Sequence, residues 1–378
     1  MNPSPSTAGA NIYPDTGLQV AVVNYESAWR LEQQLTAWQP DLIIADEGHK
    51  IKTHNTAASK AMHWLGAKAK YRLLLTGTVI TNKALDVFSQ YKFLNPDIFG
   101  NSFYSFRNRY FDMTGYGNHT PVLKKLMEND LTNRLHSIAF RATKAECLDL
   151  PATTDIVRSV ELEPAAMRVY RDLVKESYAE LSSDQSITAA NVLTRLLCLS
   201  QLTGGFVTED NSAAAQSISK AKLNALADII DEAQQEGRKL VVIARFVPEI
   251  KAICKLLEKQ GIGYSCIMGD VKDREAQVSQ FQNDPNITVF VGQIATAGLG
   301  ITLTAASSLV FYSTDYSMSN HEQARARIHR VGQRENCTYI YLAAKGTVDE
   351  KVLAALQNKA DLAKTLIDDY KKGHNPYE

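Results

Sequence analysis

The sequence lacks several features that would each point to a particular class of protein. Its cysteines, Cys147, Cys198, Cys254, Cys266 and Cys337, form no C-x-x-C pair. This excludes a zinc finger or a disulfide framework and favours a reducing compartment. No stretch reaches the roughly 18 apolar residues of a membrane span, and the first residues lack the basic and apolar regions of a signal peptide. We therefore expect a cytoplasmic protein without a membrane partner.

A net charge is also absent. Lys and Arg number 41, Asp and Glu number 41, and the formal net charge is zero. This excludes a histone-like protein that binds nucleic acid through overall positive charge, but it leaves open a local surface that reads phosphates. The 378 residues, 45% hydrophobic and 22% charged, have room for two or three ordinary globular domains.

Short apolar runs alternate with amphipathic segments along the chain. This pattern is typical of parallel sheets covered by helices and predicts an α/β fold. The strands expected in the first part are Val20–Asn24, Leu42–Ala45 and Arg72–Leu75, with a helix over Asn55–Leu65. A helical insertion is expected over 96–150, then a strand over Ile156–Leu162, helices over Pro164–Leu202 and a loop over Gly204–Ser219.

A second α/β series follows this loop. Its expected strands are Leu240–Ala244, Tyr264–Met268, Thr288–Gly292, Ser308–Tyr312 and Thr338–Leu342, and its expected helices are Val247–Gln260 and Arg274–Asn283. The domains predicted are an N-terminal lobe (1–95), the helical insertion (96–150), a strand and helical linker (151–220), a C-terminal lobe (221–345) and a final helix (346–378).

One apolar strand is followed by two carboxylates and a histidine. Asp46, Glu47 and His49 come directly after Leu42–Ala45. Because the carboxyl ends of parallel strands line the ligand crevice of an open α/β sheet, these groups would emerge beside a ligand. In P-loop phosphoryl-transfer sites an Asp at this place holds Mg²⁺ and a neighbouring acid polarises the attacking water. The alternative is a turn with two solvated acids.

Two glycine-containing loops also follow apolar runs. Thr76, Gly77 and Thr78 place two hydroxyls around a glycine, which can sense a phosphate or form an ordinary strand-ending turn. Gly298 and Gly300 permit a close backbone approach, and amides at the start of a following helix can face a phosphate. Tight packing of that helix on the sheet is the alternative.

A glutamine and two arginines stand at helical spacing. Gln323, Arg327 and Arg330 are at positions i, i+4 and i+7 of a predicted helix. Ser319 and Glu322 have the spacing of a capping box and predict the start of this helix, and a glycine two residues after Arg330 predicts its end. The three side chains would share one face. This suits an arginine-finger site, because guanidinium stabilises charge on a transferring phosphoryl group. The alternative is a basic face exposed to solvent. No acidic residue stands four positions from either arginine, and this argues against that alternative.

Together these elements resemble helicase superfamily two, and specifically its Swi/Snf-type branch of ATP-dependent DNA translocases. The matching runs are Gln323–Gln333, Leu75–Thr78, Asn24–Ser27, Phe140–Lys144, Ala297–Ala306 and Gly346–Glu350. The resemblance covers most of the chain and implies two RecA-like lobes with parallel sheets, the first lobe incomplete, and helical insertions between them. It implies ATP and Mg²⁺ as cofactors and double-stranded DNA as partner.

The resemblance also implies roles for individual residues. Asp46 would bind magnesium, Glu47 would activate water, and Gln323, Arg327 and Arg330 would reach the phosphates from the second lobe. The residues that would couple the nucleotide site to movement between lobes are His49, Thr76, Gly77 and Thr78. Those expected to contact nucleotide or DNA are Tyr25, Thr296, Gly298 and Gly300.

The sequence departs from this family in one element, the G-x-x-x-x-G-K-[ST] loop that cradles phosphates. None of its 20 glycines is followed by lysine, and only 45 residues precede Asp46. Three explanations stay open: a separate polypeptide carries the loop, the sequence is a shortened form of a longer one, or the chain no longer hydrolyses ATP.

Two main functions follow from this departure. One is an ATP-driven DNA translocase that needs the missing loop. The other is a non-catalytic DNA-binding or regulatory remnant of such an enzyme. A third, more distant function is a metal-dependent hydrolase using His49, His54 and His63, whose spacings do not place three ligands on one face.

Overall fold

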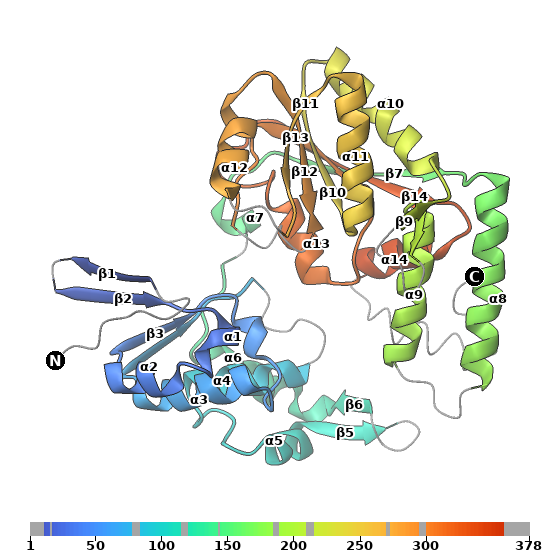
Figure 1. Ribbon diagram of the computed structural model, residues 1–378. Coiled ribbons are helices and arrows are strands. Elements are labelled where there is room, and N and C mark those ends of the chain that lie inside the picture. Colours follow the sequence, from blue (N-terminus) through green and yellow to red (C-terminus); the bar gives the residue numbers. More distant parts are fainter. Residues whose placement is uncertain are drawn as a thin grey trace. The chain divides into compact units, whose positions relative to one another are not determined.

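The computed structural model divides the chain into two compact units, Met1–Arg141 (unit 1) and Ala142–Glu378 (unit 2). It describes residues 11–15, 17–77, 84–114, 120–142, 144–183, 189–208, 215–269, 273–294 and 300–358. Figure 1 shows that strands and helices alternate in both units. The α/β prediction is therefore confirmed.

The centre of unit 1 is a two-stranded parallel sheet formed by β3 and β4. The elements of this part are β1 (Asn11–Asp15), β2 (Leu18–Val22), α1 (Tyr25–Ala28), α2 (Glu32–Trp38), β3 (Leu42–Ala45), α3 (Ala57–Lys68), β4 (Tyr71–Leu74) and α4 (Val87–Leu94). α3 begins where the Thr56 hydroxyl accepts the Ser59 N–H, which satisfies an amide of the first turn. One face of the sheet packs on a core formed by Ala28, Ala45, Ile51, Met62 and Phe93.

The stretch from 96 to 150 contains a β-hairpin as well as the expected helices. Its elements are α5 (Phe103–Tyr110), β5 (Phe111–Thr114), β6 (Thr120–Leu123), α6 (Glu128–His136) and α7 (Lys144–Cys147). Phe106 and Tyr110 of α5 are buried and pack their rings 5.1 Å apart. The Tyr110 hydroxyl donates to Asp130 at 2.6 Å. The hairpin was missed because strands of four residues are too short to show a periodicity.

Unit 2 is built on a six-stranded, entirely parallel sheet in the order β11-β12-β10-β13-β14-β7. The strands are β7 (Thr153–Val160), β10 (Lys239–Ala244), β11 (Gly263–Ile267), β12 (Ile287–Gln293), β13 (Ala306–Phe311) and β14 (Cys337–Ala344). Side chains from Leu240 to Ala244 are at most 2% exposed. The sheet is therefore covered on both faces, as parallel sheets are.

Helices and a short antiparallel strand pair complete unit 2. They are α8 (Pro164–Ser183), α9 (Ala189–Thr203), β8 (Phe206–Thr208), β9 (Ala215–Ser217), α10 (Ala221–Gln235), α11 (Val247–Gln260), α12 (Arg274–Asn283), α13 (Met318–Arg325) and α14 (Val348–Gln357). α11 and α12 have the predicted bounds. Gly261, with φ 69°, ends α11, and the Asp273 side chain accepts the Ala276 N–H at the start of α12. The loop predicted over Gly204–Ser219 was wrong in part, because it includes the β8–β9 pair.

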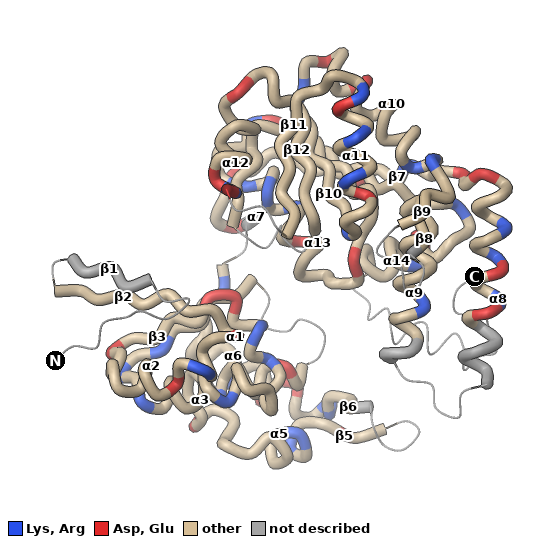
Figure 2. The backbone as a smooth tube through the Cα atoms, viewed as in Figure 1, with Lys and Arg blue, Asp and Glu red and all other residues tan. Residues whose placement is uncertain are grey.

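Acidic and basic residues are interspersed over both units in Figure 2, as the zero net charge predicts. An electrostatic contact with a polyanion would therefore depend on local groups of residues. Within the described ranges, no helix combines the length and the apolar character that a membrane crossing requires.

Candidate functional site

Two carboxylates emerge at the carboxyl end of β3. Asp46 and Glu47 follow Ala45, the last residue of the strand. The Leu75 N–H donates to the Ala45 carbonyl at 2.9 Å, and the Gly48 N–H donates to the Leu75 carbonyl at 2.8 Å. The turn that carries Asp46 and Glu47, here called the acidic turn, is therefore hydrogen-bonded to the end of β4. It lies at the sheet edge where open α/β folds bind ligands.

Glu47 has a left-handed backbone, with φ 50° and ψ 50°. For a residue with a side chain this conformation costs about 1–2 kcal/mol. Among the described residues other than glycine, Gln39 and Glu47 are those with positive φ. The Glu47 N–H donates to Asp46 Oδ1 at 3.0 Å, so the turn also orients Asp46. Backbone strain of this kind clusters at functional sites.

His49 orients the Glu47 side chain. Its Nδ1 lies 3.1 Å from Glu47 Oε2. Burial lowers the pKa of His49 below its usual value, and this outweighs the opposite effect of Glu47. The imidazole is therefore neutral at pH 7, and its Nδ1–H donates to the carboxylate. Glu47 stays 37% exposed in this arrangement, so its carboxylate is both held and reachable.

Tyr25 supports the same turn from α1. Its hydroxyl donates to the Asp46 carbonyl at 2.7 Å. Burial raises the pKa of Tyr25 to about 12, and the carboxylates of Asp46 and Glu47 add to the effect. The phenol is therefore a hydrogen-bond donor at any physiological pH. The structure brings Tyr25 into the acidic turn, and its contact with nucleic acid stays a prediction.

The loop after β4 begins beside the acidic turn. Thr76 is half-buried and Gly77 is exposed, whereas Thr78 lies outside the described residues. The hydrogen bonds that join Leu75 to Ala45 and Gly48 connect this loop to the carboxylates. A displacement of the loop would therefore move the acidic turn as well.

The helix expected to carry Gln323, Arg327 and Arg330 is shorter than predicted. α13 is capped by Ser317, whose hydroxyl accepts an N–H three residues further on, and not by Ser319. The helix ends two residues before Arg327. Gln323 is thus helical and half-buried, whereas the two arginines lie in the turns that follow. The prediction that all three share one helix face is therefore wrong.

The hydrogen-bond ladder of α13 is interrupted at Arg327, whose N–H donates to the Ala324 carbonyl three residues back, at 3.0 Å, and not to the residue four back. Tertiary hydrogen bonds then hold the turns that follow. The Arg327 carbonyl accepts the Leu303 N–H at 2.9 Å, and the Ile328 carbonyl accepts the Gln333 side-chain amide at 3.2 Å. Gly332, with φ 100°, comes after the helix has already ended, so its predicted role as the helix stop is also wrong.

Arg327 and Arg330 nevertheless converge on one stretch of backbone. Arg327 Nη1 donates to the Ile301 carbonyl at 3.5 Å, and Arg330 Nη1 donates to the same oxygen at 3.3 Å and to Gly300 at 3.5 Å. Gly300 has φ 71°, which favours glycine. Each guanidinium carries five N–H donors, so this pair can also bind an anion. Thr296 and Gly298 lie outside the described residues.

Arg325, from the same run, was not predicted to belong to any site. Its Nη2 lies 3.0 Å from Asp155 Oδ2 on β7, its Nη1 pairs with Oδ1, and its guanidinium stacks on Tyr339. Burial alone would raise the pKa of Asp155, but the ion pair brings it below its usual value. Arg325 therefore positions the turn that bears Arg327. Sequence spacing could not reveal a partner 170 positions away.

The residues at the acidic turn fit a magnesium ion that arrives with phosphates. Asp46 is exposed, and no group of three His, Cys, Asp or Glu residues able to hold a metal occurs in the described part of the chain. Mg²⁺ is usually bound by one or two carboxylates together with substrate phosphates, so the single Asp46 suffices. No described residues support a separate metal hydrolase site with His49, His54 and His63.

An acid pair follows a strand end in unit 1, and an arginine pair follows α13 in unit 2. Residues 14–204 match the SNF2-related domain, and residues 221–332 match the helicase conserved C-terminal domain. The chain therefore belongs to the SNF2-related family, the Swi/Snf-type branch of helicase superfamily two. The resemblance inferred from the motifs is confirmed.

Similar proteins include helicases and DNA repair proteins. An ATP-dependent helicase of Mycoplasma pneumoniae is 28% identical over 97% of this chain and 34% of its own length. A DNA repair and recombination protein RAD54-like of Drosophila pseudoobscura pseudoobscura is 27% identical over 93% of this chain and 49% of its own length. The Sulfolobus solfataricus SWI2/SNF2 ATPase core in complex with dsDNA is 28% identical, with a TM-score of 0.48, over 93% of this chain and 73% of that one. The chain spans between a third and a half of these curated relatives.

Proposed function

We propose that this protein is a DNA-dependent ATPase of Swi/Snf type that moves along double-stranded DNA. The observation that carries the proposal is the acidic turn, where Asp46, the strained Glu47 and His49 are held together at a strand end. A turn of two solvated acids has no physical need for a left-handed glutamate oriented by a neutral histidine. Membership of the SNF2-related family and similarity to DNA repair and recombination proteins support the proposal.

The residues of unit 1 bind the metal and prepare the water. Bound ATP would supply the phosphoryl group, and Mg²⁺, when bound, would neutralise its charge. Asp46 would hold the metal through its exposed carboxylate. Glu47 orients the attacking water and accepts its proton, and His49 keeps the Glu47 carboxylate in place. Thr76, Gly77 and Thr78 transmit the state of this site to the rest of the unit.

The residues of unit 2 stabilise charge and contact DNA. Arg327 and Arg330 donate to phosphate oxygens, where planar guanidinium groups are most effective, and Gln323 assists them. DNA is contacted through phosphate-facing backbone and hydroxyl groups rather than through a large basic surface, in keeping with the zero net charge. The residues proposed for contacts with nucleotide or DNA are Tyr25, Thr296, Gly298 and Gly300.

The sequence printed here contains no G-x-x-x-x-G-K-[ST] loop that could cradle phosphates. No glycine in the chain is followed by lysine, so its own residues do not form the usual grip on the β- and γ-phosphates. We propose that a G-x-x-x-x-G-K-[ST] segment acts in trans or belongs to a longer form of the protein. With the loop in place, the acidic turn and the arginine pair have the complementary chemistry for hydrolysis.

A DNA-stimulated ATPase assay tests this function. The chain is measured with and without duplex DNA, and with and without a P-loop-containing segment of a SNF2-related relative. Turnover is expected only when DNA and the segment are both present, and Glu47→Gln should lower it by about 10²–10⁴-fold. Glu128→Gln, an exposed carboxylate on α6, is the matched control and should leave turnover unchanged. Equal turnover in both variants, or none in any mixture, contradicts the proposal.

A non-catalytic DNA-binding or regulatory role is the second candidate. The observation that favours it is the same missing lysine, because without it the chain has little grip on ATP. This role predicts binding to duplex DNA that weakens with salt and does not respond to ATP. A change in DNA affinity on addition of ATP and Mg²⁺ would exclude it.

A further inference from the structure

Two cysteines from different elements of unit 2 lie in contact. Cys254 is on α11 and Cys266 is on β11, and a side-chain hydrogen bond joins their thiols. Both are free thiols, and both side chains are half-buried. Cys337 differs from them, because it is buried and its thiol donates to the Ile328 carbonyl at 3.9 Å. Cys254 and Cys266 are here called the thiol pair.

The packing of α11 on β11 places the two thiols opposite each other. Alternate residues of a strand face the same side of a sheet, so Tyr264 and Cys266 point in one direction. Both pack with Cys254 against the core beneath α11, whereas Ile267 belongs to the core on the opposite face. Figure 1 shows α11 lying along the sheet. The thiol pair therefore connects the helix layer to the sheet.

A second contact fixes this arrangement. Glu258 lies one helical turn after Cys254 on α11, and Tyr264 lies two residues before Cys266 on β11. The Tyr264 hydroxyl donates to Glu258 Oε1 at 2.7 Å. Two neighbouring side-chain contacts thus join the helix to the strand. β11 is an edge strand of the sheet, so the half-buried thiols lie at the border of the sheet and not at its centre.

The contact makes the two sulfurs chemically unequal. The hydrogen bond with the Cys266 thiol lowers the pKa of Cys254 below its usual value, and it outweighs the opposite effect of burial. The same hydrogen bond, together with burial, raises the pKa of Cys266. The thiolate is the reactive form of cysteine. Cys254 is therefore the sulfur that ionises first and attacks an oxidant, while Cys266 keeps its proton.

We propose that the thiol pair is a site of reversible oxidation, at which a peroxide converts Cys254 and Cys266 into a disulfide that joins α11 to β11. In the first step the Cys254 thiolate attacks one oxygen of hydrogen peroxide, the O–O bond breaks, and hydroxide leaves. Cys254 is then a sulfenic acid. In the second step the Cys266 sulfur attacks the Cys254 sulfur, the S–O bond breaks, and the departing hydroxide takes the Cys266 proton to form water.

The two sulfurs together give two electrons to the peroxide, and a dithiol reductant returns them. The disulfide closes the segment between Cys254 and Cys266 into a loop, which removes conformational freedom from the unfolded chain. The midpoint of thermal unfolding of unit 2 should therefore rise by about 5 °C on oxidation. The thiol pair couples the stability of unit 2 to the level of oxidant, and this inference does not depend on the proposed ATPase activity.

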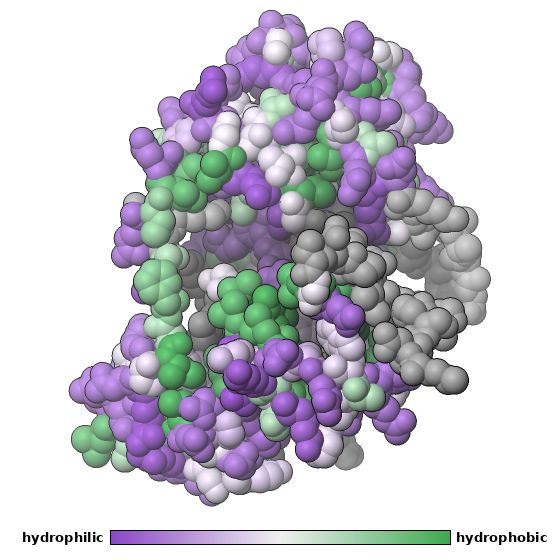
Figure 3. Space-filling view, turned by 90° about the vertical axis from the view of Figure 1, so that its left-hand side faces the viewer, coloured by the Kyte–Doolittle hydropathy of each residue, from purple (hydrophilic) through white to green (hydrophobic). Residues whose placement is uncertain are grey.

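Thiol counting after mild oxidation tests the proposal. Cys147 and Cys198 are exposed, and hydrophobic residues gather on the surface of unit 1 in Figure 3, so copies of the chain can associate and crosslink through these thiols. The full chain therefore carries Cys147→Ser and Cys198→Ser and is kept dilute. A small molar excess of hydrogen peroxide should remove the thiols of Cys254 and Cys266 together, and dithiothreitol should restore both. Mass spectrometry of a digest should locate the disulfide between them.

Single substitutions in the same background separate the two steps. Cys266→Ser removes the second thiol, so peroxide should leave a sulfenic acid at Cys254 that a 1,3-diketone probe labels, without a disulfide. Cys254→Ser should abolish both the label and the disulfide. Cys337→Ala is the matched control, because it removes a thiol outside the pair, and it should still form the disulfide. Thermal unfolding of the reduced variants verifies their fold, and Cys266→Ala replaces Cys266→Ser if the serine variant is unfolded.

Three outcomes would overturn the proposal. The first is a pair that keeps both thiols in peroxide while small thiols under the same conditions are oxidised. The second is equal labelling by the probe in Cys254→Ser and Cys266→Ser, because Cys254 is then not the attacking sulfur. The third is a midpoint of thermal unfolding that stays the same or falls when the disulfide forms, since the bond then does not fasten α11 to β11.

Discussion

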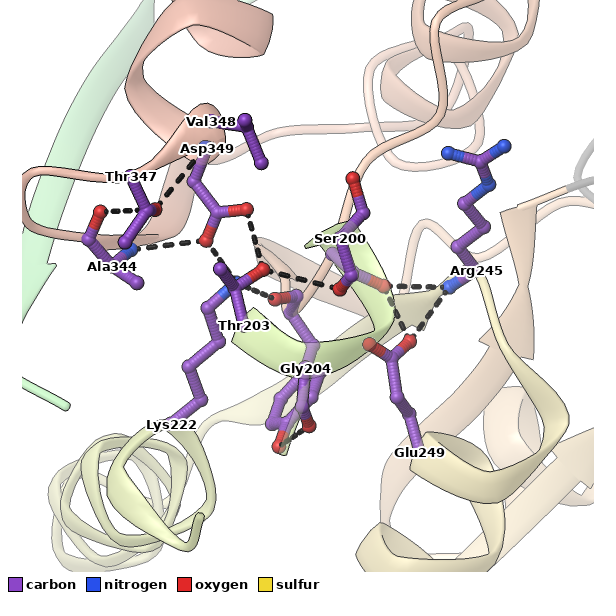
Figure 4. Close-up of polar contacts among 12 residues, drawn as sticks. Ser200, Thr203, Gly204, Lys222, Arg245, Glu249, Ala344, Thr347, Val348 and Asp349 are labelled. Carbon is purple, nitrogen blue, oxygen red and sulfur yellow. Dashed lines mark hydrogen bonds and ion pairs between the residues drawn. The ribbon is translucent and has the colours of Figure 1, made fainter. Parts of the chain in front are cut away.

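The ammonium group of Lys222 lies 2.6 Å from Asp349 Oδ2 in the interior of unit 2. Asp349 also accepts the Thr203 hydroxyl at 2.8 Å and the Ala344 N–H at 3.0 Å, and Lys222 donates to the Tyr312 carbonyl at 3.3 Å. Figure 4 shows this network, which joins α9, α10, β14 and the start of α14. The Gly346–Glu350 run of the sequence therefore contains the residue that joins these four elements.

Removal of Asp349 should destabilise unit 2 strongly. Asp349→Ala leaves the Lys222 charge buried without its partner, and breaking a buried pair in this way typically costs about 3–5 kcal/mol. The double variant Lys222→Met with Asp349→Leu should recover most of the loss, because no charge then remains in the interior. Urea unfolding of the unit 2 transition measures both. A double variant as unstable as Asp349→Ala would show that the hydrogen bonds, and not the charge, matter most.

The free energy of unfolding should decrease as the pH rises from mildly acidic to neutral, because of Glu249. This side chain is 1% exposed, and burial raises its pKa to about 7 from an ordinary 4.5. The folded protein therefore holds a proton that the unfolded chain releases, and the free energy of unfolding decreases as the pH rises from 4.5 to about 7. At 1.4 kcal/mol for each pKa unit, the decrease is about 3 kcal/mol.

Glu249→Gln is the variant that tests this pH dependence. Its amide can still accept the Phe246 N–H, which Glu249 Oε2 accepts at 3.0 Å, and it carries no charge at any pH. Thermal unfolding at pH 5.5 and pH 8 should show a smaller difference for Glu249→Gln than for the wild type, with the variant more stable at pH 8. Identical pH profiles would mean that Glu249 is ionised in the folded protein at both pH values.

Relief of the backbone strain at Glu47 should separate stability from activity. Glu47→Gly removes the side chain that disfavours the left-handed conformation and should stabilise unit 1 by about 1 kcal/mol while abolishing ATP hydrolysis. Gln39→Gly is the matched control, because Gln39 has φ 55° and lies at the end of α2. It should stabilise unit 1 by a similar amount and leave hydrolysis unchanged. Hydrogen exchange in unit 1 measures the stability, and destabilisation by both substitutions would refute the strain argument.

Gly48 should not tolerate a larger residue. A Cβ at this position would lie 2.3 Å from Leu74 Cγ, so Gly48→Ala forces the core of unit 1 to shift and should cost about 1–3 kcal/mol. Combining it with Leu74→Ala should remove the clash. The double variant should therefore lose less free energy of unfolding than the two single variants lose together. Gly77→Ala, whose Cβ would meet nothing within 4 Å, is the control. A Gly48→Ala variant as stable as the wild type would show that Leu74 can rotate away at no cost.

Local chemistry determined the elements that the sequence predicts best. α11 and α12 begin and end as expected because the residues that cap them stand a few positions apart in the sequence, and α11 is also amphipathic. The acidic turn could also be located in advance, because a run of four apolar residues followed by two carboxylates places the charges at a strand end. The family resemblance needed no more than the order and spacing of such short runs.

The tertiary structure decided what depends on distant partners. The turns after α13 are held by the Leu303 N–H, which donates to the Arg327 carbonyl, and by Asp155 on β7, which pairs with the Arg325 side chain, and no local spacing contains these contacts. The left-handed backbone of Glu47 and its contact with His49 likewise depend on the packing of β3 against β4. The sequence of β3 predicts a buried strand, whereas Leu42 and Ile44 are 49% and 53% exposed. The core residues of α1, α3 and α4 pack on the other face, against Ile43 and Ala45, and only the folded structure shows which face they cover.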